Sequence, residues 1–389
     1  MQSVRDDVEK VVVIDGGDAF GNASSISSLD DKLMAEYLFK GMDLIGYDVM
    51  NLGEEDFRFG ETFLAERLAE VDFAVTSANV VRQSDEAPYA APYFTKTMGD
   101  TTVGIIGVMH EEAKENVEEA SAIAGKGVTV EPVAASVEAA MAAMGEVDLT
   151  VVLAHMSIDA ARELAETLDG VKVVAASHDK TGPIAEELEG EHGNLAYVST
   201  GYDGKWVATL GLVVNPSGSL SKATWESVAL DDTFDDDPVL AALYQEYLDR
   251  LATEAQNIID GIPQETPEGG AYLGGDWCVA CHQDQATHWA TTKHAQAFAT
   301  LEHTNHDYSP SCFPCHTVGF GFLGGFLLPD LTPNVANVQC ESCHGAGQDH
   351  VNSPGLGFAP PAVTQCTKCH TPENSPQFDM LTYLPQVQH

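Results

Sequence analysis

The first 228 residues alternate short apolar runs with segments whose apolar residues recur every three to four positions. Apolar runs rich in β-branched residues predict buried strands. They are VVVID at 11–15, FAVTSANV at 73–80, TVGIIGV at 102–108, LTVVLAH at 149–155 and VKVVAAS at 171–177. Between them, Leu29 to Ile45 and Val133 to Met144 have the apolar spacing of helices. This alternation of strands and helices predicts an α/β domain.

The pattern changes after residue 228. An acidic stretch ends at Pro238, and an apolar face from Leu240 to about Ile259 then predicts a connecting helix. The stretch 261–270 is dense in Pro and Gly, as is typical of a linker. Little periodicity follows, so we expect a small, mostly irregular and helical domain. The predicted organisation is a first domain at 1–228, an acidic linker with its connecting helix at 229–270, and a second domain at 271–389.

Charge narrows the classes of partner. The 389-residue chain has 18 Lys and Arg against 60 Asp and Glu, a net charge of −42. Such a chain is repelled by nucleic-acid phosphates and by anionic lipid surfaces, so we expect no nucleic-acid partner. No apolar run approaches the roughly 18 residues that a membrane-spanning helix needs, so we expect no transmembrane segment.

All eight cysteines fall after residue 270, in four pairs that are each followed at once by histidine. These CxxCH motifs are Cys278, Cys281 and His282; Cys312, Cys315 and His316; Cys340, Cys343 and His344; and Cys366, Cys369 and His370. Two thiols at this spacing can form thioethers to the two vinyl groups of one haem, while the adjacent imidazole binds its iron. The motifs therefore predict four covalently attached haem c groups. A structural zinc site is the alternative, although zinc does not require a histidine after every pair.

The cofactor also predicts a location. Haem c is attached outside the cytoplasm, so we expect a periplasmic or extracellular protein. Residues 1–10 contain no apolar signal-peptide core. We therefore expect the sequence to be a processed or trimmed form.

Seven strings in the first domain resemble one known family. They are VVVIDGGDAF (11–20), IGYDVMNLGEEDFRFG (45–60), SANV (77–80), VGIIGV (103–108), VVLAH (151–155), AASHDK (175–180) and STGYDGKWVATLGL (199–212). Over roughly residues 8–215 the chain resembles the metallophosphatase domain of the 5′-nucleotidase family. The resemblance implies a sheet sandwich flanked by helices. It also implies a site where two metal ions clamp the attacking and leaving oxygens of a phosphate ester.

The residues of that metal site are only partly present. Asp18 matches the bridging aspartate, His155 a metal histidine and His178 the first histidine of the family's Gly-His-x-His. The family's Gly-Asn-His-Glu is here Gly53-Glu54-Glu55-Asp56, without the metal-binding Asn and the His that stabilises the transition state. Lys180 replaces the last metal histidine, and the opening Asp-x-His strand would lie upstream. We therefore expect a catalytically inactive scaffold. The alternative is a remodelled single-metal site that adds Glu54 or Glu55 to the three matching residues.

The second domain resembles another family. It contains WCVACHQDQATHWATTKHAQAF, CFPCHTVGFGFLGGF, TPNVANVQCESCHGAGQDHV, and CTKCH with PQFDM. From about residue 272 to 380 these strings resemble the tetrahaem cytochrome c family of the hydroxylamine-oxidation pathway. The resemblance implies closely paired haems, mostly bound by two histidines, that pass electrons along a short chain. By the same resemblance, His294 is the distal ligand of the third haem, opposite His344, and His350 that of the first, opposite His282.

The other distal ligands must come from the remaining histidines. His306 and His389 are the natural candidates for the His316 and His370 haems, one for each, and we favour His389 on the His316 haem. His288 and His303 are the alternatives. The tail that carries His389, FDMLTYLPQVQH, has an apolar and partly aromatic pattern suited to packing.

These observations predict an extracytoplasmic multihaem cytochrome that exchanges electrons with redox partner proteins. Its acidic α/β domain is expected to serve as a scaffold, docking or assembly module. The carrier would act singly or as a homo-oligomer in an extracellular filament. Two alternatives stay open. A five-coordinate haem on His316 would make the protein a redox enzyme acting on nitrite, nitric oxide or hydroxylamine, whereas a surviving metal site would make it a phosphoesterase or sulfur-ester hydrolase with an attached redox module.

Overall fold

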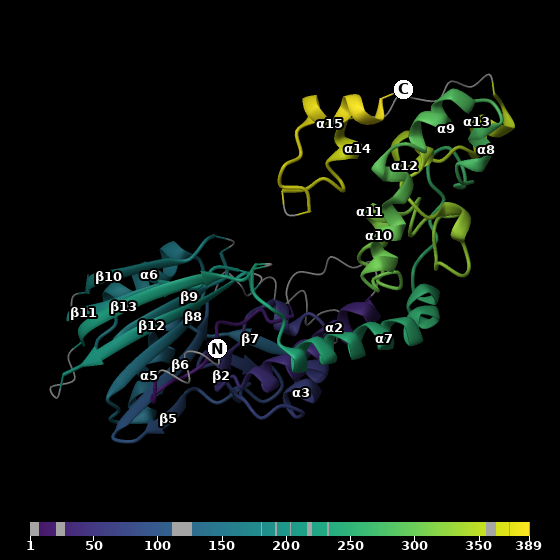
Figure 1. The fold of residues 1–389 in the computed structure, drawn as a ribbon. Helices are drawn as coiled ribbons and strands as arrows, with labels where there is room; N and C mark the ends of the chain where they lie inside the picture. The colour runs from purple at the N-terminus through teal and green to yellow at the C-terminus, as the bar shows by residue number, and fades with distance from the viewer. Residues whose placement is uncertain are drawn as a thin grey trace. The chain divides into compact units, whose positions relative to one another are not determined.

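A computed structural model shows the fold (Figure 1). It describes residues 8–20, 28–110, 127–179, 181–190, 193–202, 204–215, 220–231, 233–354, 363–372 and 374–388. The chain forms two compact units. Unit 1 comprises Met1–Asn22 and Met34–Ala241, and unit 2 comprises Ala23–Leu33 and Ala242–His389. Among the helices of these described ranges, none has an apolar stretch long enough to cross a membrane.

The largest element of unit 1 is a six-stranded sheet. Its order is β10 (Ile184–Gly190), β11 (Gly193–Ser199), β9 (Val173–Ser177), β8 (Leu149–His155), β6 (Thr101–Met109) and β5 (Phe94–Met98). The four inner strands run parallel, whereas β10 and β5 pair antiparallel at the two edges. Every residue of β8 is buried. Both faces of the sheet are covered at its centre, which is why β6 and β8 have mostly apolar sequences instead of alternating ones.

Alternate residues of β8 enter different cores. Val152 and Ala154 pack with α5 (Val133–Met144) and α6 (Ile158–Thr167) on one face. Val151 and Leu153 pack on the other face with the hairpin of β12 (Trp206–Val214) and β13 (Leu220–Ala229). The result is a sheet with helices on one side and a β-hairpin on the other.

A smaller parallel sheet carries β1 (Ile14–Asp15), β2 (Val49–Asn51) and β3 (Ala74–Thr76). The fully buried Asn51 ties this sheet to the larger one. Its side-chain amide donates to the carbonyl oxygens of Val108 in β6 at 3.0 Å and Leu153 in β8 at 3.1 Å. A separate apolar cluster joins α2 (Ser28–Ile45), η1 (Glu55–Phe57) and α3 (Glu61–Leu68) to the ribbon of β4 (Val80–Arg82) and β7 (Val128–Val130).

The α/β class predicted for the first domain is confirmed. The runs at 102–108, 149–155 and 171–177 are β6, β8 and β9, and the helix expected from Val133 to Met144 has those bounds. The run 73–80 is split between β3 and β4, because the buried polar residues Ser77 and Asn79 interrupt it. Only the end of the run 11–15 is paired, as β1.

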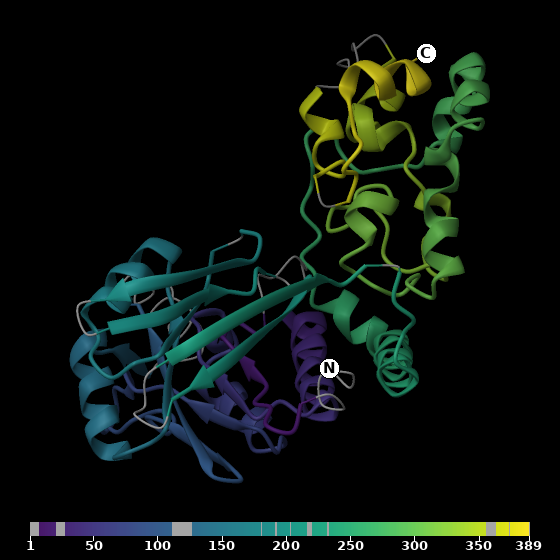
Figure 2. The same ribbon diagram turned by 60° about the vertical axis from the view of Figure 1, so that its left-hand side comes forward.

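Unit 2 consists of helices with irregular connections (Figure 2). The connecting helix is present as α7 (Pro238–Asp260), and Asp237 caps it by accepting hydrogen bonds from the backbone N–H groups of Val239 and Leu240. The other helices are short: α8 (Asp276–Val279), α9 (Gln283–Trp289), η3 (Lys293–Gln296), α10 (Ala297–His303), α11 (Phe313–His316), η4 (Pro333–Val335), α12 (Cys340–His344), α13 (Gln348–Asn352), α14 (Val363–Cys366) and α15 (Met380–Val387).

The apolar core of unit 2 is small and aromatic. Phe313 packs against Phe326 and Phe320 with ring centres 4.9 Å and 5.1 Å away, and the end of α7 closes the cluster through Ile259. In contrast, α8, α9, α13 and α15 bury no residue. The polypeptide core therefore covers only part of this unit.

Candidate functional site

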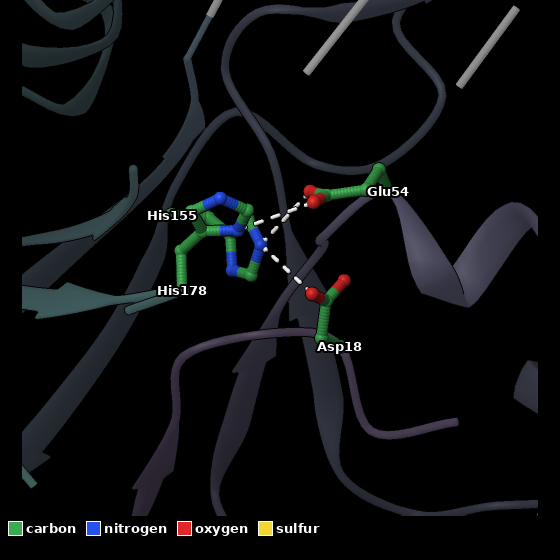
Figure 3. A group of neighbouring side chains, drawn as sticks. All are labelled: Asp18, Glu54, His155 and His178. Atoms are coloured by element: carbon green, nitrogen blue, oxygen red, sulfur yellow. Dashed lines mark ion pairs between the residues drawn. The ribbon is translucent and has the colours of Figure 1, made fainter. Parts of the chain in front are cut away.

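Four side chains converge where strands of unit 1 end (Figure 3). Asp18 follows β1, Glu54 follows β2, His155 ends β8 and His178 follows β9. Their ligand atoms all lie within 4.8 Å of one another. The structure thus brings together the three residues matched in the sequence. It adds Glu54, one of the two glutamates considered for a remodelled site.

The loops that carry Asp18 and Glu54 touch because glycine stands on both sides of the contact. Gly17 has φ +98°, and a Cβ there would lie 2.6 Å from the backbone nitrogen of Gly53. A Cβ on Gly53 would collide with the Asp18 carboxylate. Asp18 itself adopts φ +63°, a left-handed conformation that Asp accepts better than most residues. Together these features place Asp18 beside Glu54.

Asp56 holds the two loops in contact. Its Oδ2 accepts hydrogen bonds from the backbone N–H groups of Asp18 at 3.0 Å and Gly53 at 2.8 Å. Asp18 in turn accepts a hydrogen bond at Oδ1 from the backbone N–H of Glu55 at 2.8 Å. Sequence reasoning did not find this role for Asp56, because nothing in a degenerate motif shows which distant loop its carboxylate will reach.

His155 is oriented from behind so that one nitrogen faces the carboxylates. Its Nδ1–H donates to the Gly16 carbonyl oxygen at 3.0 Å, and Ser177 Oγ lies 3.1 Å from the same nitrogen. In the neutral imidazole this bond leaves the lone pair on Nε2. Nε2 lies 3.2 Å from Asp18 Oδ2 and 3.0 Å from Glu54 Oε2.

The centre of the cluster is deeply buried and His178 forms its outer side. His155 is 1% exposed and Glu54 is 4% exposed, whereas 41% of the His178 side chain is exposed. His178 Nδ1 lies 3.1 Å from Glu54 Oε1. Within the buried part, Glu54 Oε2 and His155 Nε2 find no partner with hydrogen-bond geometry. These two buried atoms therefore lie 3.0 Å apart without forming a hydrogen bond.

The cluster keeps its charges although it is buried. Burial lowers the pKa of His155, but the carboxylates of Asp18 and Glu54 outweigh that effect and hold this pKa well above its ordinary value. Burial raises the pKa of Glu54, but the two histidines outweigh it and hold this pKa well below its ordinary value. Beneath the cluster, burial and the charge of Asp18 raise the pKa of Asp56 to about 8. The lowered pKa of Glu54 thus keeps this carboxylate ionised beside the two imidazoles.

Glu55, the second of the two glutamates, does not join the cluster. Glu55 forms an ion pair with Arg58, with 3.5 Å between Oε2 and the guanidinium, and it is not among the clustered ligands. Lys180 lies outside the described residues. Of the two glutamates considered, only Glu54 is directed at the histidines.

The CxxCH motifs lie in unit 2, where their cysteines meet in pairs. The thiols of Cys278 and Cys340 are hydrogen-bonded, as are those of Cys315 and Cys369. These contacts join the first motif to the third and the second to the fourth. None of the eight cysteines, which all lie within the described ranges, forms a disulfide. Within the described ranges no three Cys or His side chains of these motifs lie close enough together for the alternative zinc site.

Two histidine pairs face each other in unit 2. The ring centres of His282 and His350 lie 6.4 Å apart, and those of His294 and His370 lie 6.2 Å apart. The expected ligand pairs, His350 with His282 and His294 with His344, stay predictions. Burial, together with His370, lowers the pKa of His294, which favours the neutral imidazole that binds metals. The spacing of motifs along the chain does not determine which of them meets His294.

Two CxxCH histidines are oriented by hydrogen bonds at Nδ1. His316 donates through Nδ1–H to the Ala297 carbonyl oxygen at 2.7 Å. His370 Nδ1 lies 3.0 Å from Ser375 Oγ, and its ring stacks on Phe378 with 4.4 Å between centres. Such bonds leave Nε2 available to a metal.

The remaining predicted ligands are placed differently. His306 contacts α7: its Nε2 lies 2.6 Å from the Tyr244 hydroxyl, and its Nδ1 lies 3.0 Å from Thr304 Oγ1. Because both ring nitrogens are engaged, we leave His306 out of the ligand set proposed below. His389 lies outside the described residues, and its role as an iron ligand stays a prediction.

Comparison with known proteins identifies the second domain. Residues 277–345, which contain the first three CxxCH motifs, match the family model for cytochrome c554 and c-prime. The carboxyl-terminal region is a cytochrome c554-like domain. Cytochrome c-554 of Nitrosomonas europaea is 32% identical over 93 residues, which make up 20% of this chain and 40% of that protein. The cytochrome c554 family implies covalently bound haem c and redox partners.

The amino-terminal region matches 5′-nucleotidases. The Rattus norvegicus enzyme is 23% identical over 321 residues, 74% of this chain and 54% of that protein. The structure of a 5′-nucleotidase precursor from Thermus thermophilus is 23% identical with a TM-score of 0.53, covering 66% of this chain and 52% of that one. A calcineurin-like phosphoesterase from Bacillus subtilis is 18% identical with a TM-score of 0.53, covering 64% and 86%. These likenesses confirm the metallophosphatase fold ahead of the cytochrome c554-like domain. The chain spans about half the length of the 5′-nucleotidases that it matches.

Proposed function

We propose that this protein transfers electrons along four covalently attached haem c groups, outside the cytoplasm. The observation that carries the proposal is the facing of CxxCH histidines by distant histidines in unit 2. An electron carrier needs haems close to one another and irons whose ligands stay the same in both redox states. The histidine separations in unit 2 bear on the iron ligands, and its cysteine contacts bear on the distances between haems.

The histidine pairs fit haem iron. Metal–imidazole bonds are about 2 Å long, so two imidazoles on opposite sides of one metal ion place their ring centres about 6 Å apart. The separations of 6.4 Å and 6.2 Å agree with this geometry. His282 and His350 would hold one iron, and His370 and His294 another. Two axial histidines leave an iron no open position for a substrate, which favours electron transfer over catalysis.

The cysteine contacts support short distances between haems. Cys278 meets Cys340, and Cys315 meets Cys369. Because each haem is anchored through such cysteines, these contacts would bring the first haem next to the third and the second next to the fourth. These two contacts support two pairs of neighbouring haems.

Exposed apolar side chains beside the motifs also fit a bound porphyrin. Trp277 is 60% exposed and Val279 is 40% exposed, and they flank Cys278. In α15, Leu381 is 86% exposed. Apolar surface of this kind normally marks a binding site. The apolar porphyrin of a covalently bound haem would cover these side chains, which the polypeptide leaves exposed.

Location and partners follow from the cofactor and the charge. Haem c attachment takes place outside the cytoplasm, which supports a periplasmic or extracellular protein. A net charge of −42 favours redox partners with basic docking surfaces. Unit 1 would serve as the scaffold or docking module, for a single carrier or for the subunit of a filament.

Mass spectrometry and EPR of the haem-loaded protein test the proposal. We expect four haem additions on the intact chain. We also expect His350→Ala and His294→Ala each to convert one haem from low-spin to high-spin, whereas Glu302→Ala, at an exposed position of α10, should not. Free thiols at any motif would refute the proposal. Unchanged EPR spectra in both His350→Ala and His294→Ala would also refute it. A high-spin haem in the unaltered protein that binds nitrite, nitric oxide or hydroxylamine would favour the redox enzyme instead.

A further inference from the structure

We propose that unit 1 binds one divalent transition-metal ion between Asp18, Glu54, His155 and His178. This site is separate from the haem-binding residues of unit 2, and the proposal does not depend on the electron-transfer function. Of the residues that the structure describes, these four form the one group of three or more His, Cys, Asp or Glu side chains with ligand atoms so close together.

The distances suit a single ion. Ligands at about 2 Å from a tetrahedral metal lie about 3.3 Å from one another. His155 Nε2 lies 3.0 Å from Glu54 Oε2 and 3.2 Å from Asp18 Oδ2, and His178 Nδ1 lies 3.1 Å from Glu54 Oε1. These three contacts have the spacing of ligands on one ion, and all four ligand atoms lie within 4.8 Å of one another.

Burial shows that the donors lack another partner. Glu54 Oε2 and His155 Nε2 are both buried, and although they lie 3.0 Å apart as an ion pair, neither has a partner with hydrogen-bond geometry. Buried polar atoms are nearly always hydrogen-bonded or bound to an ion, so each exception needs an explanation. A cation between the carboxylates and the imidazole would satisfy both atoms at once.

The surroundings orient the donors inward. The Gly16 carbonyl holds His155 Nδ1–H and leaves Nε2 to the site. The Glu55 backbone N–H holds Asp18 Oδ1 and leaves Oδ2 to the site. Supporting hydrogen bonds of this kind are the usual companions of metal ligands.

The neighbouring carboxylates argue for one ion rather than two. Asp56 is engaged with the backbone of Asp18 and Gly53, and Asp15 accepts a hydrogen bond from the Gly17 N–H. Both act on the loops and not on the cluster. The four ligands that remain are enough for one tetrahedral ion. Two imidazoles with two carboxylates suit Zn²⁺ or another first-row transition metal, whereas Ca²⁺ and Mg²⁺ prefer six or more oxygens.

Zinc titration of the haem-loaded, chelator-treated full chain tests the proposal. Isothermal calorimetry should give one tight Zn²⁺ site per chain, and the melting temperature of unit 1 should rise with zinc. Elemental analysis should find one zinc in addition to the haem iron. Glu54→Gln keeps the size of the side chain but removes the charge, and it should weaken zinc binding at least about 100-fold.

Two further variants separate loss of the site from loss of the fold. His178→Ala removes the half-exposed ligand with little effect on the core, and it should also weaken binding strongly. Glu55→Gln alters the adjacent glutamate, which pairs with Arg58, and it should bind zinc as the unaltered protein does. Zinc-independent stability, a stoichiometry of two, or unchanged affinity in both Glu54→Gln and His178→Ala would each overturn the proposal.

Discussion

Glu341 stands inside the third CxxCH motif and should be a main determinant of unit 2 stability. Its side chain is 3% exposed, and its carboxylate accepts hydrogen bonds from three backbone N–H groups. Gly347 donates at 2.7 Å, Gly274 at 2.8 Å, and Leu273 at 3.0 Å and 3.1 Å to the two oxygens. The carboxylate thereby ties the segment before the first motif to the third motif and to the loop after it.

Replacement by alanine leaves those three amides without an acceptor. Hydrogen bonds to a charged group contribute about 1.5–3 kcal/mol each, and an unsatisfied buried donor costs about 1–3 kcal/mol. Water can enter the space left by the side chain and recover part of this loss. We therefore expect Glu341→Ala to lower the free energy of unfolding of unit 2 by about 3–5 kcal/mol. Glu341→Gln keeps one acceptor oxygen and should cost about 2 kcal/mol.

Guanidinium unfolding followed by Soret and far-UV circular dichroism measures these differences in the haem-loaded protein. Glu302→Ala is the matched control, because Glu302 is an exposed residue of α10 in the same unit, and it should stay within about 0.5 kcal/mol of the unaltered protein. A loss below about 1 kcal/mol for Glu341→Ala would refute the reasoning, as would a glutamine variant less stable than the alanine variant.

Three other predictions concern a haem potential, the stability of unit 1 and the hydrolytic activity of unit 1. His294→Met should raise the potential of one haem by on the order of 100 mV in a spectroelectrochemical titration, and four unchanged potentials would remove His294 from the ligands. Asn51→Leu should lower the midpoint of urea unfolding of unit 1, with a loss of about 2–4 kcal/mol, because the carbonyls of Val108 and Leu153 lose their shared donor; a stable variant would show that Asn51 does not join the two sheets. Unit 1 should not hydrolyse nucleotides or a generic phosphate ester with Mn²⁺ or Zn²⁺, and turnover above about 1 s⁻¹ that disappears in Asp18→Ala would contradict the scaffold function.

Features of this protein that depend on neighbouring residues were predictable from the sequence. A CxxCH motif contains its two thiols and its imidazole within five consecutive positions, so haem c attachment needs no knowledge of the fold. The same holds for α7, whose capping Asp237 and apolar face are local, and for the runs that became β6, β8 and β9. These strands are buried on both faces, which makes their sequences mostly apolar.

Contacts between distant segments were decided only by the tertiary structure. Glu54 was one of two adjacent glutamates, and it is the one directed at His155 because the β1 and β2 loops meet at Gly17 and Gly53. His294 lies beside His370, and His306 meets Tyr244. In each case the sequence contains both members of the pair but not the path of the chain that joins them. Chemistry built from adjacent residues is therefore visible in the sequence, whereas the pairing of ligands depends on how the whole unit packs.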